Sequence, residues 1–132
     1  MINRRAFVLQ TLGLAAITAG KAQAALRVVA TPTHPEPRAG ITAANVLKSD
    51  QVDDGKAEFD MVREIPHIVD GIRCRCGCAD LAGNYSLLSC YEGDGMAGHC
   101  EVCQGEARLA HRLFKQGKSL TEIRAAIDAK FG

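Results

Sequence analysis

The chain has 132 residues, which is enough for one small domain once an N-terminal leader is set aside. Its 16 basic and 15 acidic residues give a formal net charge of only +1, so it lacks the basic excess typical of nucleic-acid binding, and we predict no nucleic-acid partner. It contains six Cys and no Trp. A small core so poor in large aromatic side chains often needs disulfides or a bound metal to stabilise it, and the cysteines can supply these.

Residues 1–24 have the layout of a signal peptide: two arginines, an apolar stretch to about Ala19 and the small-x-small sequence Ala22-Gln23-Ala24. The apolar stretch is shorter than the roughly 20 residues that span a bilayer. Arg4-Arg5-Ala6-Phe7-Val8-Leu9 resembles the twin-arginine signal. A general secretory signal that contains two arginines is the alternative.

This leader predicts the twin-arginine translocase as a partner during export and a location in the periplasm or elsewhere outside the cytoplasmic membrane. No cysteine precedes Cys74, so a lipid anchor at the cleavage site is not expected, and we predict no membrane anchor after cleavage. Residues 25–40 hold three prolines in six positions and show no amphipathic period, which predicts a flexible tether.

Residues 41–132 are predicted to form the six-cysteine domain. The helical spacing of Phe59, Val62 and Ile65 predicts a short helix over about 57–65, and a less regular pattern suggests another over 42–50. Pro66 suits a first helical turn, so residues 66–70 are expected to form a short helix closed by Gly71. Residues 72–100 are dense in Cys and Gly, which predicts loops and single turns.

The C-terminal third predicts two helices. One has an apolar face and ends at Gly117; the next begins with a Ser119-x-x-Glu122 capping box. The two apolar stripes are Cys103, Ala107, Ala110, Leu113 and Phe114, and then Leu120, Ile123, Ile127 and Phe131. Because the connection is short, the helices must be antiparallel neighbours. The fold class is therefore mainly α, a small helical domain with a C-terminal antiparallel helical hairpin and a cysteine-rich loop.

The six cysteines form a C-x-C-x-C group, a single cysteine and a C-x-x-C pair at the start of the first hairpin helix: Cys74, Cys76, Cys78, Cys90, Cys100 and Cys103. A helix N-terminus stabilises a thiolate, the form that binds metals or attacks disulfides. One interpretation is a metal site for copper(I) or zinc, or for an iron–sulfur cluster, with all six cysteines as candidate ligands and His99 as a possible addition.

Two other interpretations remain open. The cysteines can form three structural disulfides, as is common in small proteins of oxidising compartments. Alternatively, Cys100 and Cys103 form a redox dithiol that exchanges disulfides with partner proteins. Because twin-arginine substrates typically cross the membrane folded, often around an inserted cofactor, the leader favours the metal site. We therefore expect metal handling rather than catalysis, with a metal donor or acceptor protein as a partner.

Residues 65–132 resemble the PCYCGC-motif family of small exported bacterial proteins. The matching segments are Ile65–Asp70, Cys74-Arg75-Cys76-Gly77-Cys78, Ser86–Tyr91, Cys100-Glu101-Val102-Cys103 and the helical hairpin. Arg73 and Arg75 stand where the family's name motif has proline and tyrosine, and neither change touches a cysteine. The resemblance implies a compact metal- or thiol-bearing domain and no particular reaction.

A weaker likeness covers residues 99–132, where Cys-Glu-Val-Cys-Gln precedes a helix and Gly117–Arg124. This part is similar to the periplasmic thiol subunit of the cytochrome c maturation machinery. In that family the C-x-x-C pair reduces apocytochrome c or handles its mixed disulfides. The likeness supports thiol–disulfide exchange as the alternative function.

Overall fold

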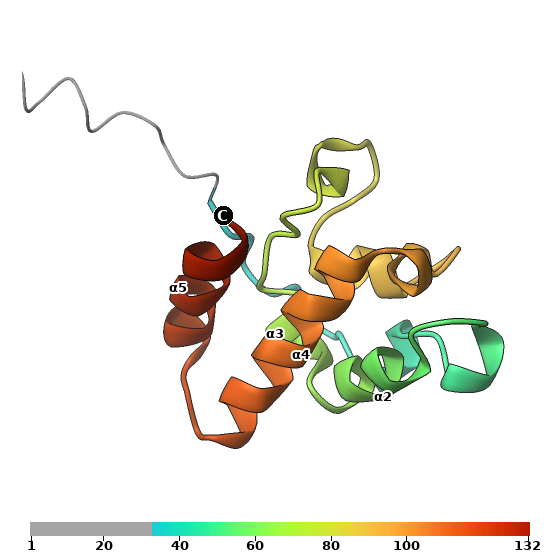
Figure 1. The fold of residues 1–132 in the computed structure, drawn as a ribbon, viewed down its shortest axis with the longest axis horizontal. Coiled ribbons are helices and arrows are strands. Elements are labelled where there is room, and N and C mark those ends of the chain that lie inside the picture. The colour runs from blue at the N-terminus through green and yellow to red at the C-terminus, as the bar shows by residue number, and fades with distance from the viewer. Residues whose placement is uncertain (1–32) are drawn as a thin grey trace, which may run out of the picture. The chain divides into compact units, whose positions relative to one another are not determined.

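A computed structural model of the chain describes residues 33–132, and this part is helical, with no β-strand among the described residues (Figure 1). Its α-helices are α2 (Lys56–Glu64), α3 (Pro66–Val69), α4 (Glu101–Lys115) and α5 (Leu120–Phe131). Five short 3-10 turns precede α2 or lie between α3 and α4 within that range: η2 (Ala43–Asn45), η3 (Ser49–Gln51), η4 (Cys78–Asp80), η5 (Leu87–Tyr91) and η6 (Met96–His99). The predicted fold class is confirmed. None of the described helices is long and apolar enough to span a membrane.

Helix α2 follows the predicted pattern, because Phe59 and Val62 are its buried residues. The predicted helix over 42–50 is wrong: η2 and η3 occupy this segment as separate turns. The side chain of Asn45 accepts the backbone N–H of Thr42, and that of Gln51 accepts the N–H of Lys48. Such local side-chain bonds compete with a continuous helical ladder.

Asp70, directly after α3, anchors two distant segments. Its carboxylate is fully buried and accepts hydrogen bonds from the Arg38 backbone (2.7 Å) and guanidinium (2.7 Å) and from the Ser86 hydroxyl (2.7 Å). Arg124 of α5 also donates to the carbonyl of Pro35 (2.7 Å). The predicted signal residues 1–24 and residues 25–32, the first half of the predicted tether, lie outside the described residues, whereas residues 34–38 contact the helical domain.

The predicted hairpin of α4 and α5 is confirmed, with α5 turning back against α4 (Figure 1). Gly117 has a left-handed φ of 80° and donates to the carbonyl of Phe114, while Lys118 donates to Leu113. This pair of bonds is the Schellman motif that ends a helix at glycine. The Ser119 hydroxyl and the Glu122 carboxylate then form the predicted capping box of α5.

Helix α4 is the centre of the described domain, since α2, α3 and α5 all contact it. The core includes Phe59, Leu87, Leu88, Tyr91, Ile123 and Ile127, all fully buried. Residues 72–100 pack over the start of α4 through backbone and side-chain bonds: Leu87 donates to Ile72 (2.7 Å), and the Tyr91 hydroxyl donates to the Cys103 carbonyl (2.8 Å). These bonds bring the cysteine-rich loop to the first turn of α4.

Candidate metal centre

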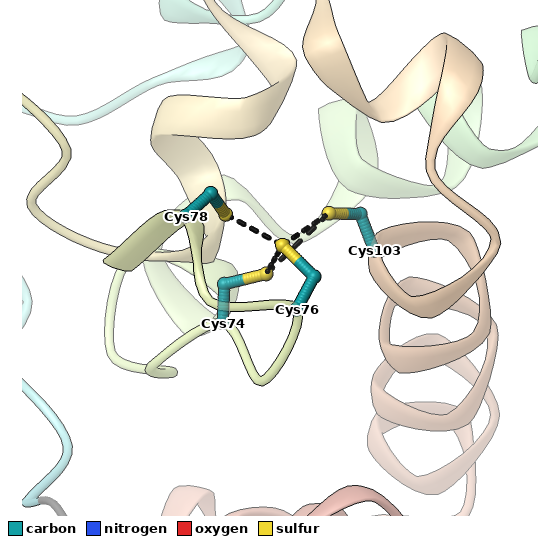
Figure 2. Close-up of side chains that lie close together, drawn as sticks. All are labelled: Cys74, Cys76, Cys78 and Cys103. Carbon is teal, nitrogen blue, oxygen red and sulfur yellow. Dashed lines mark hydrogen bonds between the residues drawn. The ribbon is translucent and has the colours of Figure 1, made fainter. Parts of the chain in front are cut away.

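Four cysteine sulfurs converge where the C-x-C-x-C loop meets the start of α4. The ligand atoms of Cys74, Cys76, Cys78 and Cys103 all lie within 4.8 Å of one another. Figure 2 shows the Cys76 sulfur between the other three. It lies 3.2 Å from the sulfur of Cys74, 2.7 Å from that of Cys78 and 3.6 Å from that of Cys103. The fold therefore joins a loop and a helix that are about 25 residues apart in sequence into one sulfur cluster.

The remaining two cysteines border this cluster. The sulfur of Cys90, in η5, lies 3.3 Å from that of Cys78. Cys100 is the N-cap of α4, and its sulfur accepts the backbone N–H of Cys103 (3.3 Å). All six cysteines are free thiols in the structure. Cys90 thus borders the cluster through a sulfur contact, and Cys100 lies beside it through the backbone of Cys103.

His99 is not brought into the sulfur cluster. Its side chain is 78% exposed, and its Nδ1 lies 3.8 Å from a carboxylate oxygen of Asp54. The other three histidines also have partners elsewhere: His34 pairs with Asp128, His111 with Glu64, and the ring of His67 contacts that of Phe114. The first coordination sphere offered by the described residues is therefore sulfur.

Glu106 is the site residue that sequence reasoning missed. It is fully buried one turn after Cys103, and its Oε1 accepts the backbone N–H of Arg75 (2.8 Å), while its Oε2 has no hydrogen-bond partner among the described residues. Burial, followed by the proximity of the Cys74 sulfur, raises the pKa of Glu106 to about 9. The Cys103-x-x-Glu106 spacing could have indicated that Glu106 lies near the cysteines, because residues three apart share one helix face.

A polar network holds the C-x-C-x-C loop from its other side. The guanidinium of Arg75 pairs with the Asp128 carboxylate of α5. His34 lies in the same network, with its Nδ1 accepting the backbone N–H of Arg73 (2.9 Å) and its Nε2 at 3.0 Å from Asp128. Burial lowers the pKa of His34, and a neutral ring protonated at Nε2 satisfies both contacts. Helix α5 thus positions the loop without supplying a sulfur.

The thiols of the cluster resist losing their protons together. Hydrogen bonds from neighbouring thiols, Cys103 first, lower the pKa of Cys90. Burial and the sulfurs of its neighbours raise the pKa of Cys78, and hydrogen bonding to Cys74 raises that of Cys103. One thiolate is therefore stabilised by the others, but further thiolates would repel it. A bound cation removes this repulsion, because metal ligation requires deprotonated thiols.

The donor set fits a thiophilic metal ion. A zinc ion with bonds of about 2.3 Å places tetrahedral thiolates about 3.8 Å apart. The four clustered sulfurs, with contacts from 2.7 Å upward and none beyond 4.8 Å, bracket this spacing. Thiolate ligands also suit copper(I). The cysteine cluster could therefore hold a metal ion.

The comparison with protein families agrees with the motif that carries this cluster. The family described as "Protein of unknown function with PCYCGC motif" matches residues 39–132, a longer segment than the 65–132 predicted from the motif alone. No curated protein and no solved structure matches the chain. Because this match covers well over half of the sequence, the chain belongs to the PCYCGC-motif family of proteins of unknown function.

Proposed function

We propose that this protein binds a thiophilic metal ion, copper(I) or zinc, through its cysteine cluster and acts in metal handling in the cell envelope. The observation that carries the proposal is the convergence of the Cys74, Cys76, Cys78 and Cys103 sulfurs within 4.8 Å. Three of these come from a five-residue loop and the fourth from the first turn of α4. Thiolates grouped this closely are well suited to bind soft or borderline metal ions.

The number of sulfurs bears on which ion is bound. One tetrahedral zinc ion needs four thiolates, whereas Cys90 and Cys100, beside the cluster, bring the number of nearby sulfurs to six. Six sulfurs suit a small copper(I)–thiolate cluster, or one four-ligand site beside a disulfide. Stoichiometry therefore distinguishes the two ions, with more than one copper(I) expected per chain if all six cysteines take part.

Export in the folded state is part of this proposal. The leader resembles a twin-arginine signal, which would let the cluster be loaded where thiols are kept reduced and then carried to the periplasm or cell exterior. A donor or acceptor protein for the metal would then act as a partner. Replacing Arg4 and Arg5 by lysine should abolish export through the twin-arginine translocase, and export that is unchanged would point to the general secretory route.

The test of the metal site is an anaerobic titration of the reduced protein with zinc and with copper(I), each against a competing chelator, followed by native mass spectrometry. Cys103→Ser should weaken binding by roughly tenfold or more, since it removes a clustered ligand. His99→Ala is the matched control and should bind as the wild type does. If purified protein carries no metal and has a mass lower by about six hydrogens, three disulfides replace the metal site.

Thiol–disulfide exchange is the second candidate, favoured by one observation. The Cys100 sulfur caps α4 and accepts the Cys103 N–H (3.3 Å), which places the first cysteine of the C-x-x-C pair at the helix start. Cys103 is almost fully buried, at 1% exposure, as a resolving cysteine would be. If this function holds, Cys103→Ala should trap a mixed disulfide between Cys100 and a partner protein. Absence of such a trapped species under oxidising conditions would count against it.

A further inference from the structure

The six cysteines differ sharply in their access to solvent. Cys74, Cys90 and Cys103 are at most 2% exposed, and Cys78 and Cys100 are half-buried. Cys76 is the one that is exposed. Yet its sulfur is central to the cluster, since it contacts those of Cys74, Cys78 and Cys103 (Figure 2). Cys76 therefore both belongs to the sulfur cluster and is accessible to solvent.

The chain around Cys76 leaves room for an incoming group. Gly77 has a left-handed φ of 91°, and no heavy atom lies within 4 Å of the position that a Cβ would take there. A cleft of about 150 Å³ lies on the same loop and is lined by Arg73, Cys74, Arg75, Gly77, Ala79 and Asp80. This is smaller than the roughly 300–1,000 Å³ of small-molecule sites. Its lining includes the clustered Cys74, and Cys76 lies between two of the lining residues, Arg75 and Gly77, in the chain.

A metal ion held by buried thiolates can leave only by ligand exchange. An incoming thiol must reach the ion and form a new metal–sulfur bond while one existing bond breaks. The proton of the incoming thiol passes to the cysteine that is released, so charge is conserved and nothing is oxidised or reduced. The residue released first must be exposed, and the remaining ligands must keep hold of the ion during the exchange.

We infer that Cys76 is the exchange ligand of this site and that its partner is a thiol presented by a metal donor or acceptor protein. The inference rests on the proposed metal-binding function and adds the point at which the metal enters and leaves. Cys74 and Cys103, both buried, hold the ion while the bond to Cys76 is replaced by a bond to the partner's sulfur. Loading follows the same steps in reverse.

The first measurement is transfer of bound metal to a thiol. The metal-loaded protein is mixed with increasing glutathione and a chromogenic chelator, and the rate of metal release is followed. For the wild type the rate should rise with glutathione concentration. In Cys76→Ser this thiol-dependent rate should change by about tenfold or more, because the exposed exchange ligand is gone. His99→Ala, a change at an exposed side chain outside the sulfur cluster, should keep the wild-type dependence; equal effects in both variants would overturn the inference.

A second measurement keeps the inference testable if Cys76→Ser does not fold or load. The reduced, metal-free wild type is treated with iodoacetamide for short times, and modified peptides are quantified. Cys76 should react about tenfold faster than Cys74, Cys90 or Cys103, because thiol modification follows access. Similar rates at Cys76 and Cys90 would contradict the inference. Failure of metal binding itself appears separately, as a wild-type protein that takes up no ion in the titration.

Discussion

The backbone N–H of Arg75 donates a 2.8 Å hydrogen bond to Oε1 of Glu106, and this bond fastens the C-x-C-x-C loop to the helix that carries Cys103. The other oxygen of Glu106 is buried without a partner in the part of the chain that the structure describes. Burial and the nearby Cys74 sulfur raise the pKa of the carboxyl to about 9. Glu106 is therefore an uncharged acid at neutral pH in the metal-free protein, and it adds no negative charge beside the thiols.

Glu106→Gln should change how stability depends on pH. The folded pKa lies above the unfolded value of 4.5, so the contribution of Glu106 to stability is fully present below about pH 4.5. It is lost as the pH rises toward 9, by up to about 1.4 kcal/mol per pH unit. Glutamine keeps the acceptor for Arg75 and does not ionise. The reduced, metal-free variant should thus be more stable than the wild type at about pH 8 and little different at about pH 4.5.

Chemical denaturation of both proteins, with reductant and chelator present, measures this difference. The readout is the free energy of unfolding of the variant minus that of the wild type at each pH, which cancels the other titrating groups. Glu36→Gln is the matched control, because its side chain is 87% exposed and should show no such trend. A difference that stays constant between about pH 5 and pH 8 would mean that Glu106 is already ionised in the folded protein.

Asp70→Asn should destabilise the domain by about 2 kcal/mol at neutral pH, since it removes charge-assisted hydrogen bonds from Arg38 and weakens that from Ser86. Burial opposes ionisation of Asp70, but the bonds from Arg38 and Ser86 outweigh it and lower its pKa. The stabilisation is therefore present above the unfolded pKa of 3.8 and is lost as the pH falls through the folded value.

Thermal unfolding of the wild type and Asp70→Asn at about pH 7 and at lower pH tests this expectation, and the gap between them should narrow in acid. Asp80→Asn serves as the control, because Asp80 is 77% exposed and its ion pair with Arg73 lies at the surface. Exposed pairs contribute about 0–1 kcal/mol. Equal losses of stability in the two variants would show that the contacts of buried Asp70 contribute no more than an exposed ion pair does.

Sequence patterns predicted the helices well where a repeating apolar face and end signals agreed. The hairpin has both, with Gly117 ending α4 and Ser119 beginning α5. They failed over 42–50, where the side chains of Asn45 and Gln51 bond locally and interrupt the helix. A propensity count does not register such bonds.

The site was predicted in part for a similar reason. Cysteine identity alone indicated candidate ligands, and the structure brings the sulfurs of four of them together. The sequence could not show that His99 faces solvent, because its place beside Cys100 in the chain does not fix its direction. Nor could it show that Glu106 is buried, since charged residues almost always lie at the surface. Both depend on how the loop packs against α4.

Gly71→Ala should destabilise the protein by about 1–3 kcal/mol through overpacking. A Cβ there would lie 2.8 Å from Cδ2 of Leu120 and 3.0 Å from Cγ of Pro37, so Gly71 lets the start of α5 and the segment before residue 39 approach it closely. In a Leu120→Ala background the cost of Gly71→Ala should be smaller, because the nearest atom is gone. Unfolding of the four proteins in denaturant measures this coupling; a cost that is the same in both backgrounds would exclude Leu120 as its source.

Cys100 has two separable roles, and serine and alanine substitutions distinguish them. As the N-cap of α4 its sulfur accepts the Cys103 N–H, a task that a serine hydroxyl performs well and alanine cannot. In the reduced, metal-free protein, Cys100→Ala should therefore be about 1 kcal/mol less stable than Cys100→Ser. Both lack the sulfur, so any loss of metal stoichiometry should be equal in the two. If the alanine variant alone binds less metal, Cys100 acts on the site by ordering the first turn of α4, and its sulfur is not a ligand.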